Sequence, residues 1–218
     1  QPIPNYLIFD KAKWGDCLSG ALTIKNYWDG LRTAGFKGLH QVTIIPWRVI
    51  DGIHFVSITL TGYKLALTSS APFPAFATLT GPFSQVVDEL GTTFYRGNPQ
   101  QIDERTASLF ALARYKDRFI VAERPVPLSA EDSRTIAVYP EEAPCVWEGY
   151  FAVLTGPFLA VCDDDHHMYR CGEPVEICSK TFNVLHTPYY QPYFANINRA
   201  REGVTSEPVI CGTSTACC

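Results

Sequence analysis

The segment AFATLTGPFSQVV, residues 75–87, returns as YFAVLTGPFLAVC at residues 150–162. Between residues 76–88 and residues 151–163, nine of thirteen positions are identical, including the run Leu-Thr-Gly-Pro-Phe. Each copy offers only a threonine hydroxyl as a reactive group, and no base stands beside it to activate it as a nucleophile. We therefore interpret the motif as a structural device: a strand, a glycine–proline turn or kink, and a second strand.

A weaker copy of the motif, Leu60-Thr61-Gly62-Tyr63, follows the run FVSITL at residues 55–60. In this run, apolar residues alternate with Ser57 and Thr59, which predicts a strand with one buried face. After Gly62 the apolar positions shift by one residue, which indicates a tight turn or a β-bulge. Residues flanking the two close copies match poorly at the offset of 75, so the sequence alone does not establish a complete internal repeat.

The overall pattern predicts a mainly β fold, either an antiparallel barrel or a curved sheet or sandwich, with at most one or two short helices. Further strands are expected at Leu18–Lys25, His40–Ile45, Ser108–Ala113 and Phe119–Ala122. A polar turn at residues 115–118 joins the last two. A helix over residues 102–115, capped by Asp103, is the competing interpretation of that region. Residues 125–144 contain four prolines and predict a loop or extended connector.

Eight cysteines in a chain of 218 residues indicate an oxidising compartment and disulfide bonds. One cysteine lies near the start of the chain and the others lie in an acidic final third, residues 145–218. A disulfide from Cys17 would tie the two ends together, so we expect a single domain over residues 1–218. The spacings fit no zinc module, and the pairing stays open. The cysteines expected in disulfides are Cys17, Cys145, Cys162, Cys171, Cys178, Cys211, Cys217 and Cys218.

Several features predict a secreted protein and exclude other classes. The sequence starts with Gln1 and has a single methionine, Met168, as in a mature chain whose signal peptide has been removed. No apolar run is long enough to span a membrane. A net charge of −4 without a basic cluster argues against binding to nucleic acid.

Acid–base chemistry has few candidates. The run Asp163-Asp164-Asp165-His166-His167 lacks the spacing of calcium or zinc ligands, so we interpret it as a solvated hairpin tip without a metal. Hydrolase and phosphate-binding motifs are absent from the sequence. An extracellular hydrolase that uses scattered His40, Asp51, His54 and His186 remains an alternative.

Aromatic residues are the most informative population. Twenty-eight residues are Phe, Tyr or Trp, and they crowd into HTPYYQPYF at residues 186–194, where two prolines favour extended backbone. Rings of this kind line protein cores as well as sites for apolar ligands. The candidate ligand-binding residues are Trp28, Phe55, Tyr63, Tyr189, Tyr190 and Tyr193.

These observations favour a secreted, non-enzymatic binding, transport or storage protein. Its expected cargo is an apolar small molecule, either a lipid or a pigment such as a carotenoid, and no other cofactor is expected. A third alternative is a defensive or structural module that forms homo- or hetero-oligomers through exposed aromatic residues and the terminal cysteines.

Overall fold

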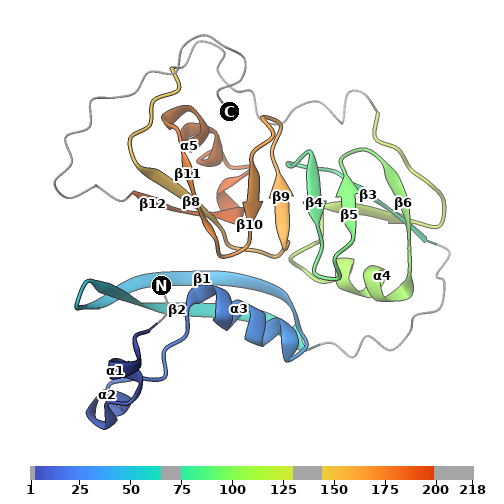
Figure 1. Cartoon of the computed structure of the whole chain (residues 1–218). Coiled ribbons are helices and arrows are strands. Elements are labelled where there is room, and N and C mark those ends of the chain that lie inside the picture. Colours follow the sequence, from blue (N-terminus) through green and yellow to red (C-terminus); the bar gives the residue numbers. More distant parts are fainter. Residues whose placement is uncertain (1–2, 65–74, 130–143, 199–218) are drawn as a thin grey trace. The chain divides into compact units, whose positions relative to one another are not determined.

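The computed structural model describes residues 3–64, 75–129 and 144–198 (Figure 1). The predicted mainly β class is confirmed, and the named strands pair antiparallel in several sheets. Within the described residues the strands do not close into a barrel, and the prediction of at most one or two helices is wrong, since five α-helices occur. None of the helices in the described part of the chain is long and apolar enough to cross a membrane. The chain divides into two compact units, residues 1–65 and 66–218.

The N-terminal unit contains three helices and a long hairpin. Its elements are α1 (Asn5–Ile8), α2 (Lys11–Gly15), α3 (Ile24–Thr33), β1 (Phe36–Ile50) and β2 (Ile53–Lys64). The hairpin turn consists of Asp51 and Gly52, both at positive φ, as a two-residue turn between twisted strands requires. A small buried cluster forms the core of this unit, with Leu7, Leu18, Ile53 and Phe55 as its members.

The predicted strand Leu18–Lys25 is wrong. Leu18 is buried in a turn, and α3 begins at Ile24 after the helix cap Thr23, whose side chain accepts a hydrogen bond from the backbone N–H of Asn26 at 3.1 Å. The capping threonine thus starts a helix where the apolar alternation predicted a strand. By contrast, the predicted strand His40–Ile45 lies within β1, and the run at residues 55–60 lies within β2.

The irregularity predicted at Gly62 is a bulge. Strand β2 continues through Gly62 without a turn, and the register shift lies opposite it, between Lys37 and His40 of β1. A Cβ atom at Gly62 would lie 2.6 Å from Cδ2 of Leu39, a side chain that is itself buried. The glycine is therefore required by the close approach of the facing strand.

The C-terminal unit contains two copies of one arrangement. The first copy comprises β3 (Ala75–Leu79), β4 (Gln85–Val87), β5 (Thr93–Tyr95), β6 (Pro99–Ile102), α4 (Glu104–Phe110) and β7 (Phe119–Ala122). The second comprises β8 (Tyr150–Leu154), β9 (Ala160–Cys162), β10 (Met168–Arg170), β11 (Pro174–Ile177), α5 (Ser179–Leu185), the 3-10 helix η1 (Gln191–Tyr193) and β12 (Phe194–Asn198). Each element of the first copy starts 75 residues before its counterpart in the second. The duplication therefore extends far beyond the segment whose sequence shows it.

The two copies share one sheet. Sheets β6-β3-β7 and β11-β8-β12 belong to separate copies, whereas the sheet β10-β9-β4-β5 joins them through β4 and β9, which lie side by side in Figure 1. Val86 pairs with Val161, its own counterpart, so the contact has the symmetry of a two-fold axis. Equivalent backbone bonds flank the pair, from Ser84 N to the carbonyl of Cys162 at 3.0 Å and from Leu159 N to that of Val87 at 2.9 Å.

The duplicated motif makes the junction. Its glycines, Gly81 and Gly156, have φ angles of 124° and 93°, which residues with a Cβ atom rarely adopt. The peptide bond between each glycine and the proline that follows it is cis. The carbonyl of Pro82 accepts a hydrogen bond from the hydroxyl of Tyr190 in the other copy at 3.1 Å. The predicted strand–turn–strand device is thus confirmed, and the turn also binds the partner copy.

The other copy of the motif makes the reciprocal contact. The hydroxyl of Tyr115, the counterpart of Tyr190, donates to the carbonyl of Pro157 at 3.2 Å and to Glu89 at 3.1 Å. Burial, reinforced by the nearby carboxylates, raises the pKa of both tyrosines well above the ordinary value, so their hydroxyls stay protonated as donors.

Aromatic side chains fill the core of this unit across both copies. Phe83 and Phe158 are counterparts, and their rings meet edge to face with centroids 6.4 Å apart. Tyr190 and Tyr193 pack on Phe83 with centroids 5.4 and 5.0 Å away. The extended conformation predicted for residues 186–194 is wrong, because this segment forms a turn and the 3-10 helix η1, which direct these two rings inward.

Two substitutions of glycine by alanine test the bulge. Gly62→Ala is expected to destabilise the N-terminal unit by about 1–3 kcal/mol, because Leu39 must move within a packed site. Gly30→Ala in α3 is the matched control, since no atom lies within 4 Å of its added Cβ. It should leave stability unchanged or raise it by up to about 1 kcal/mol, because alanine favours helix. Urea unfolding followed by circular dichroism measures both, and equal effects would contradict the close approach.

The junction is tested by removing one hydroxyl. Tyr190→Phe is expected to lower the free energy of unfolding by about 1 kcal/mol, because a buried donor to the Pro82 carbonyl is lost. Tyr189→Phe is the control, since Tyr189 is 55% exposed, and it should change stability by less than about 0.5 kcal/mol. Chemical denaturation of the three proteins measures the difference; a Tyr190→Phe protein as stable as the control would contradict the assigned contact.

Candidate ligand-binding site

A pocket lies on the first copy between α4 and β7. The helix α4 begins after Asp103, whose carboxylate accepts a hydrogen bond from the backbone N–H of Thr106 at 2.8 Å. This bond and a second one from the Thr106 hydroxyl lower the pKa of Asp103. The helical interpretation of this region, with Asp103 as its cap, is therefore confirmed, and the predicted strand Ser108–Ala113 is wrong. Strand β7 occupies the predicted residues, Phe119–Ala122.

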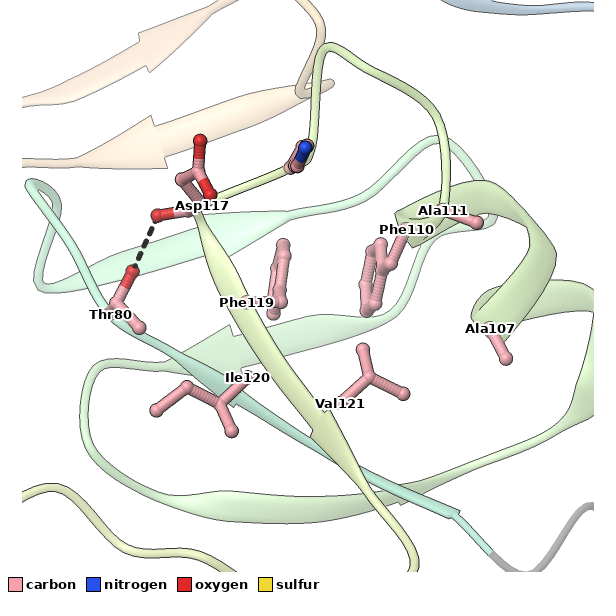
Figure 2. Close-up of a pocket in the computed structure, with 9 residues that line it drawn as sticks. Thr80, Ala107, Phe110, Ala111, Asp117, Phe119, Ile120 and Val121 are labelled. Carbon is pink, nitrogen blue, oxygen red and sulfur yellow. Dashed lines mark hydrogen bonds between the residues drawn. The ribbon is translucent and has the colours of Figure 1, made fainter.

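The pocket has a volume of about 660 Å³ and is open to solvent. Figure 2 shows its apolar floor, where the rings of Phe110 and Phe119 stack with centroids 3.8 Å apart and an interplanar angle of 7°. Ala107 of α4 and Ala111, the residue that follows this helix, contribute small side chains, and Val121, 43% exposed, contributes an apolar side chain on β7. The arrangement offers a hydrophobic surface that a flat or chain-like apolar group could cover.

Polar groups form one side of the pocket. The Thr80 hydroxyl of the duplicated motif donates to the carbonyl of Asp117 at 3.1 Å, as the dashed line in Figure 2 shows. Asp117 has a positive φ of 67°, and the backbone bond from Thr80 N to the carbonyl of Arg118 fixes the same turn. Lys116 also lines the pocket and is exposed. The rim thus carries one cation and one carboxylate beside an apolar floor.

The second copy has a different side chain where the pocket lies. Phe182 is the counterpart of Ala107, and its ring stacks on Tyr150 with centroids 4.1 Å apart. His186, the counterpart of Ala111, lies against Phe182 with ring centroids 4.0 Å apart, and its Nδ1 is 2.7 Å from the Phe182 carbonyl. Two small alanines in the first copy therefore stand where the second copy has two rings, at equivalent positions in and directly after the helix.

The six candidate ligand-binding residues fall in other places. Trp28 on α3 and Phe55 on β2 are buried in the N-terminal unit, and Tyr63 near the end of β2 is 40% exposed. Tyr190 and Tyr193 are buried in the aromatic core, and burial, opposed by Arg118, raises the pKa of Tyr193 to about 12. Tyr189 is exposed. None of the six lines the described pocket, so their role in ligand binding stays a prediction.

Three of the four scattered acid–base residues lie along the β1–β2 hairpin of the N-terminal unit, and the fourth lies in the C-terminal unit. His40 on β1 pairs with Thr61 on β2. Thr61 is seven residues from His54 on the same strand, so His40 and His54 are about 24 Å apart along the hairpin at roughly 3.4 Å per residue. Asp51 lies in the hairpin turn and accepts a hydrogen bond from the Tyr6 hydroxyl at 2.6 Å. His186 ends α5. Within the N-terminal unit, His40 therefore lies far from His54, and the hydrolase alternative stays a prediction.

The acidic run between β9 and β10 is a hairpin turn, as predicted, but its first residue is buried. Oδ1 of Asp163 accepts hydrogen bonds from the backbone N–H groups of Asp165 and His167 at 3.0 and 2.9 Å. Its Oδ2 accepts from the Tyr169 hydroxyl at 3.1 Å and lies 2.9 Å from Nδ1 of His167. Asp88, the counterpart of Asp163, accepts two backbone bonds in the same way, so this carboxylate organises the turn in both copies.

A salt bridge connects this turn to the first copy. Arg96 and Asp164 form two hydrogen bonds between guanidinium and carboxylate, and both side chains are largely buried. The same guanidinium donates to the Pro82 carbonyl at 3.0 Å. The acidic run therefore serves the junction between the copies, and the interpretation as a solvated tip is wrong for Asp163 and Asp164.

The cysteines show no disulfide among the described residues, where the near pair is 3.2 Å apart. Cys17 is exposed, Cys145 and Cys162 are half-buried, and Cys171 and Cys178 are buried. The remaining three, Cys211, Cys217 and Cys218, lie outside the described residues. Disulfide bonds, and a single domain tied together through Cys17, therefore stay predictions.

The sequence pattern did not identify the residues that line the pocket as binding residues. Ala107, Ala111 and Val121 are small or common apolar residues that carry no chemical signature. One signal was available: at the offset of 75, Ala107 stands opposite Phe182, a large change in volume between two helices that share a fold. That comparison requires the full repeat, which the sequence pattern alone did not establish.

A histidine substitution tests the network around Asp163. Burial lowers the pKa of His167, but its hydrogen bond to Asp163 and the charges of Asp163 and Asp165 outweigh burial and raise it. Because the folded-state pKa lies above the unfolded value near 6.5, the protonated histidine stabilises the fold fully below that pH. This stabilisation is lost as the pH rises through the folded-state pKa.

We expect His167→Gln to cost about 1–2 kcal/mol at mildly acidic pH and less at alkaline pH. His166→Asn is the control, since His166 is exposed and has a positive φ that asparagine tolerates. Denaturant unfolding at several pH values measures the profile. A constant difference between wild type and His167→Gln across this range would contradict the ion pair.

Comparison with known families agrees with the internal duplication. A search of curated proteins finds no match. A family model described as a domain of unknown function, DUF8838, matches the chain twice, over residues 77–143 and 141–217. The two matches correspond to the two structural copies, and together they cover more than half of the chain. The chain therefore belongs to the DUF8838 family and contains two consecutive copies of its domain.

Proposed function

We propose that the chain is a non-enzymatic binding protein that carries an apolar small molecule in the pocket between α4 and β7. The observation that carries the proposal is the apolar lining of this open pocket, in which Val121 is exposed, Phe119 is half-buried and Phe110 is buried beneath the stacked ring. Exposed aromatic and aliphatic surface in a concave site favours ligands that are themselves apolar, because binding removes both surfaces from water.

The divergence of the two copies supports the same site. In the second copy, Phe182 occupies the position equivalent to Ala107 and stacks on Tyr150. An aromatic ring at this position is therefore compatible with the fold. The first copy keeps Ala107 there, which leaves apolar surface uncovered. A larger side chain at residue 107 would bury this apolar surface and stabilise the fold. The small alanine is explained if a ligand covers the surface instead.

The rim restricts the class of ligand. Lys116 and Asp117 place opposite charges at one side of the pocket, and the Thr80 hydroxyl lies beside them. A ligand with an apolar body and one polar end matches this lining, as a lipid or an oxygenated pigment does. We further propose that the protein acts in an extracellular fluid, an inference that rests on the cysteine content of the sequence.

The pocket is tested by introducing into the first copy the phenylalanine that the second copy has at the equivalent position, Phe182. Ala107→Phe should fill it and lower the affinity for the fluorescent apolar probe 1-anilinonaphthalene-8-sulfonate at least about tenfold, equivalent to about 1.4 kcal/mol. The melting temperature should change little, because α5 accommodates Phe182 at the equivalent position. Fluorescence titration measures the affinity.

Ser108→Phe is the matched control, since it adds the same ring at an exposed position of the same helix. Equal probe binding by the two variants would contradict the pocket as the binding site. Organic extraction of the native protein, followed by mass and absorbance spectra, tests for a natural cargo. Extracts without a bound compound from several preparations would contradict a carrier function.

A further inference from the structure

Two cysteines that are far apart in the sequence meet in the second copy. Cys145 lies shortly before β8, and Cys178 lies directly before α5. Their side chains are in hydrogen-bond contact. Cys178 is buried, whereas Cys145 is half-buried and therefore reachable from solvent.

The neighbouring residues hold the two segments together. Ser179 N donates to the carbonyl of Val146 at 2.8 Å, and Val146 N donates to the Ser179 hydroxyl at 3.3 Å. The same hydroxyl donates to the carbonyl of Pro144 at 3.3 Å. Three hydrogen bonds thus fix the residues that flank both cysteines, so the contact between the sulfur atoms is built into the fold.

Cys178 occupies a position that favours a thiolate. Its counterpart in the first copy is Asp103, the carboxylate that caps α4. Burial opposes ionisation of Cys178, but hydrogen bonds from the Thr181 hydroxyl, from backbone N–H groups and from Cys145 outweigh it and lower the pKa of the thiol. The Thr181 hydroxyl lies 3.4 Å from the sulfur, as the Thr106 hydroxyl lies 2.8 Å from the Asp103 carboxylate.

We propose that Cys145 and Cys178 form a redox-active dithiol, which a small-molecule disulfide such as oxidised glutathione converts to an intramolecular disulfide. The accessible Cys145 attacks the reagent as its thiolate, forms a mixed disulfide and releases one glutathione thiolate, which takes up a proton. The Cys178 thiolate then attacks the Cys145 sulfur and releases the second glutathione. Two protein thiols are oxidised, and one glutathione disulfide is reduced to two thiols.

The product would join the segment before β8 to the start of α5 across 33 residues of sequence. A cross-link of this kind restricts the unfolded chain, so the oxidised protein should unfold at a higher urea concentration than the reduced one. The inference concerns the second copy alone and is independent of ligand binding at α4.

Peptide mapping of the full chain tests the pairing. The protein is incubated with oxidised glutathione, residual thiols are alkylated, and the sample is digested with trypsin and a glutamate-specific protease without reduction. Cys145 and Cys178 then lie in separate peptides, residues 143–148 and 177–180, and neither contains another cysteine. Mass spectrometry is expected to find these two peptides linked. Recovery of both peptides alkylated, or linked to other cysteines instead, would overturn the proposal.

Three variants complete the test. Cys145→Ser should abolish the linked peptide and the oxidation-dependent shift in the urea midpoint, whereas Cys162→Ser, at another half-buried cysteine, should retain both. Cys178→Asp restores the type of cap seen at Asp103, so the helix is preserved while the thiol is removed. In this variant Cys145 should be alkylated or glutathionylated after treatment. A shift in the urea midpoint that persists in Cys178→Asp would overturn the assignment.

Discussion

The pairing of β4 with β9 is the constraint on which the C-terminal unit depends. Val86 faces its own counterpart, Val161, so the backbone pairing that one copy makes across this line is repeated by the other. The glycine–proline turns beside the strands present carbonyl groups, and a buried tyrosine from the opposite copy donates to each. A short motif is therefore retained twice because each copy of it binds the other half of the unit.

On this common scaffold the copies differ at a few positions that matter chemically. The N-cap residue is an aspartate in α4 and a cysteine in α5, and an alanine of α4 is replaced by a phenylalanine in α5. Arg96 has Cys171 as its counterpart, so the salt bridge to Asp164 exists on one side of the axis and lacks a charged equivalent on the other. Shape is shared between the copies, whereas the groups available to ligands and oxidants are not.

Much of the local structure follows from the sequence. Period-two alternation identifies the middle of β2, the strand predicted at residues 119–122 coincides with β7, and the glycine–proline motif identifies both turns. Where two local signals compete, the helix cap decides: Thr23 and Asp103 begin helices in segments whose apolar pattern also fits strands. Residues 186–194 fold into a turn because Tyr190 and Tyr193 gain burial against Phe83, a contact between distant parts of the chain. The pocket depends on such tertiary contacts too, which no local pattern reveals.

Covalent continuity between the copies has a thermodynamic consequence. Two separate domains that associate through the same strand pair and aromatic contacts would dissociate once they are diluted below their dissociation constant. On one polypeptide, each copy experiences the other at an effective concentration on the order of millimolar, set by the tether rather than by the amount of protein present. The two copies therefore stay associated at any protein concentration. A substitution can also affect one copy alone, whereas in a homodimer it would appear in both subunits.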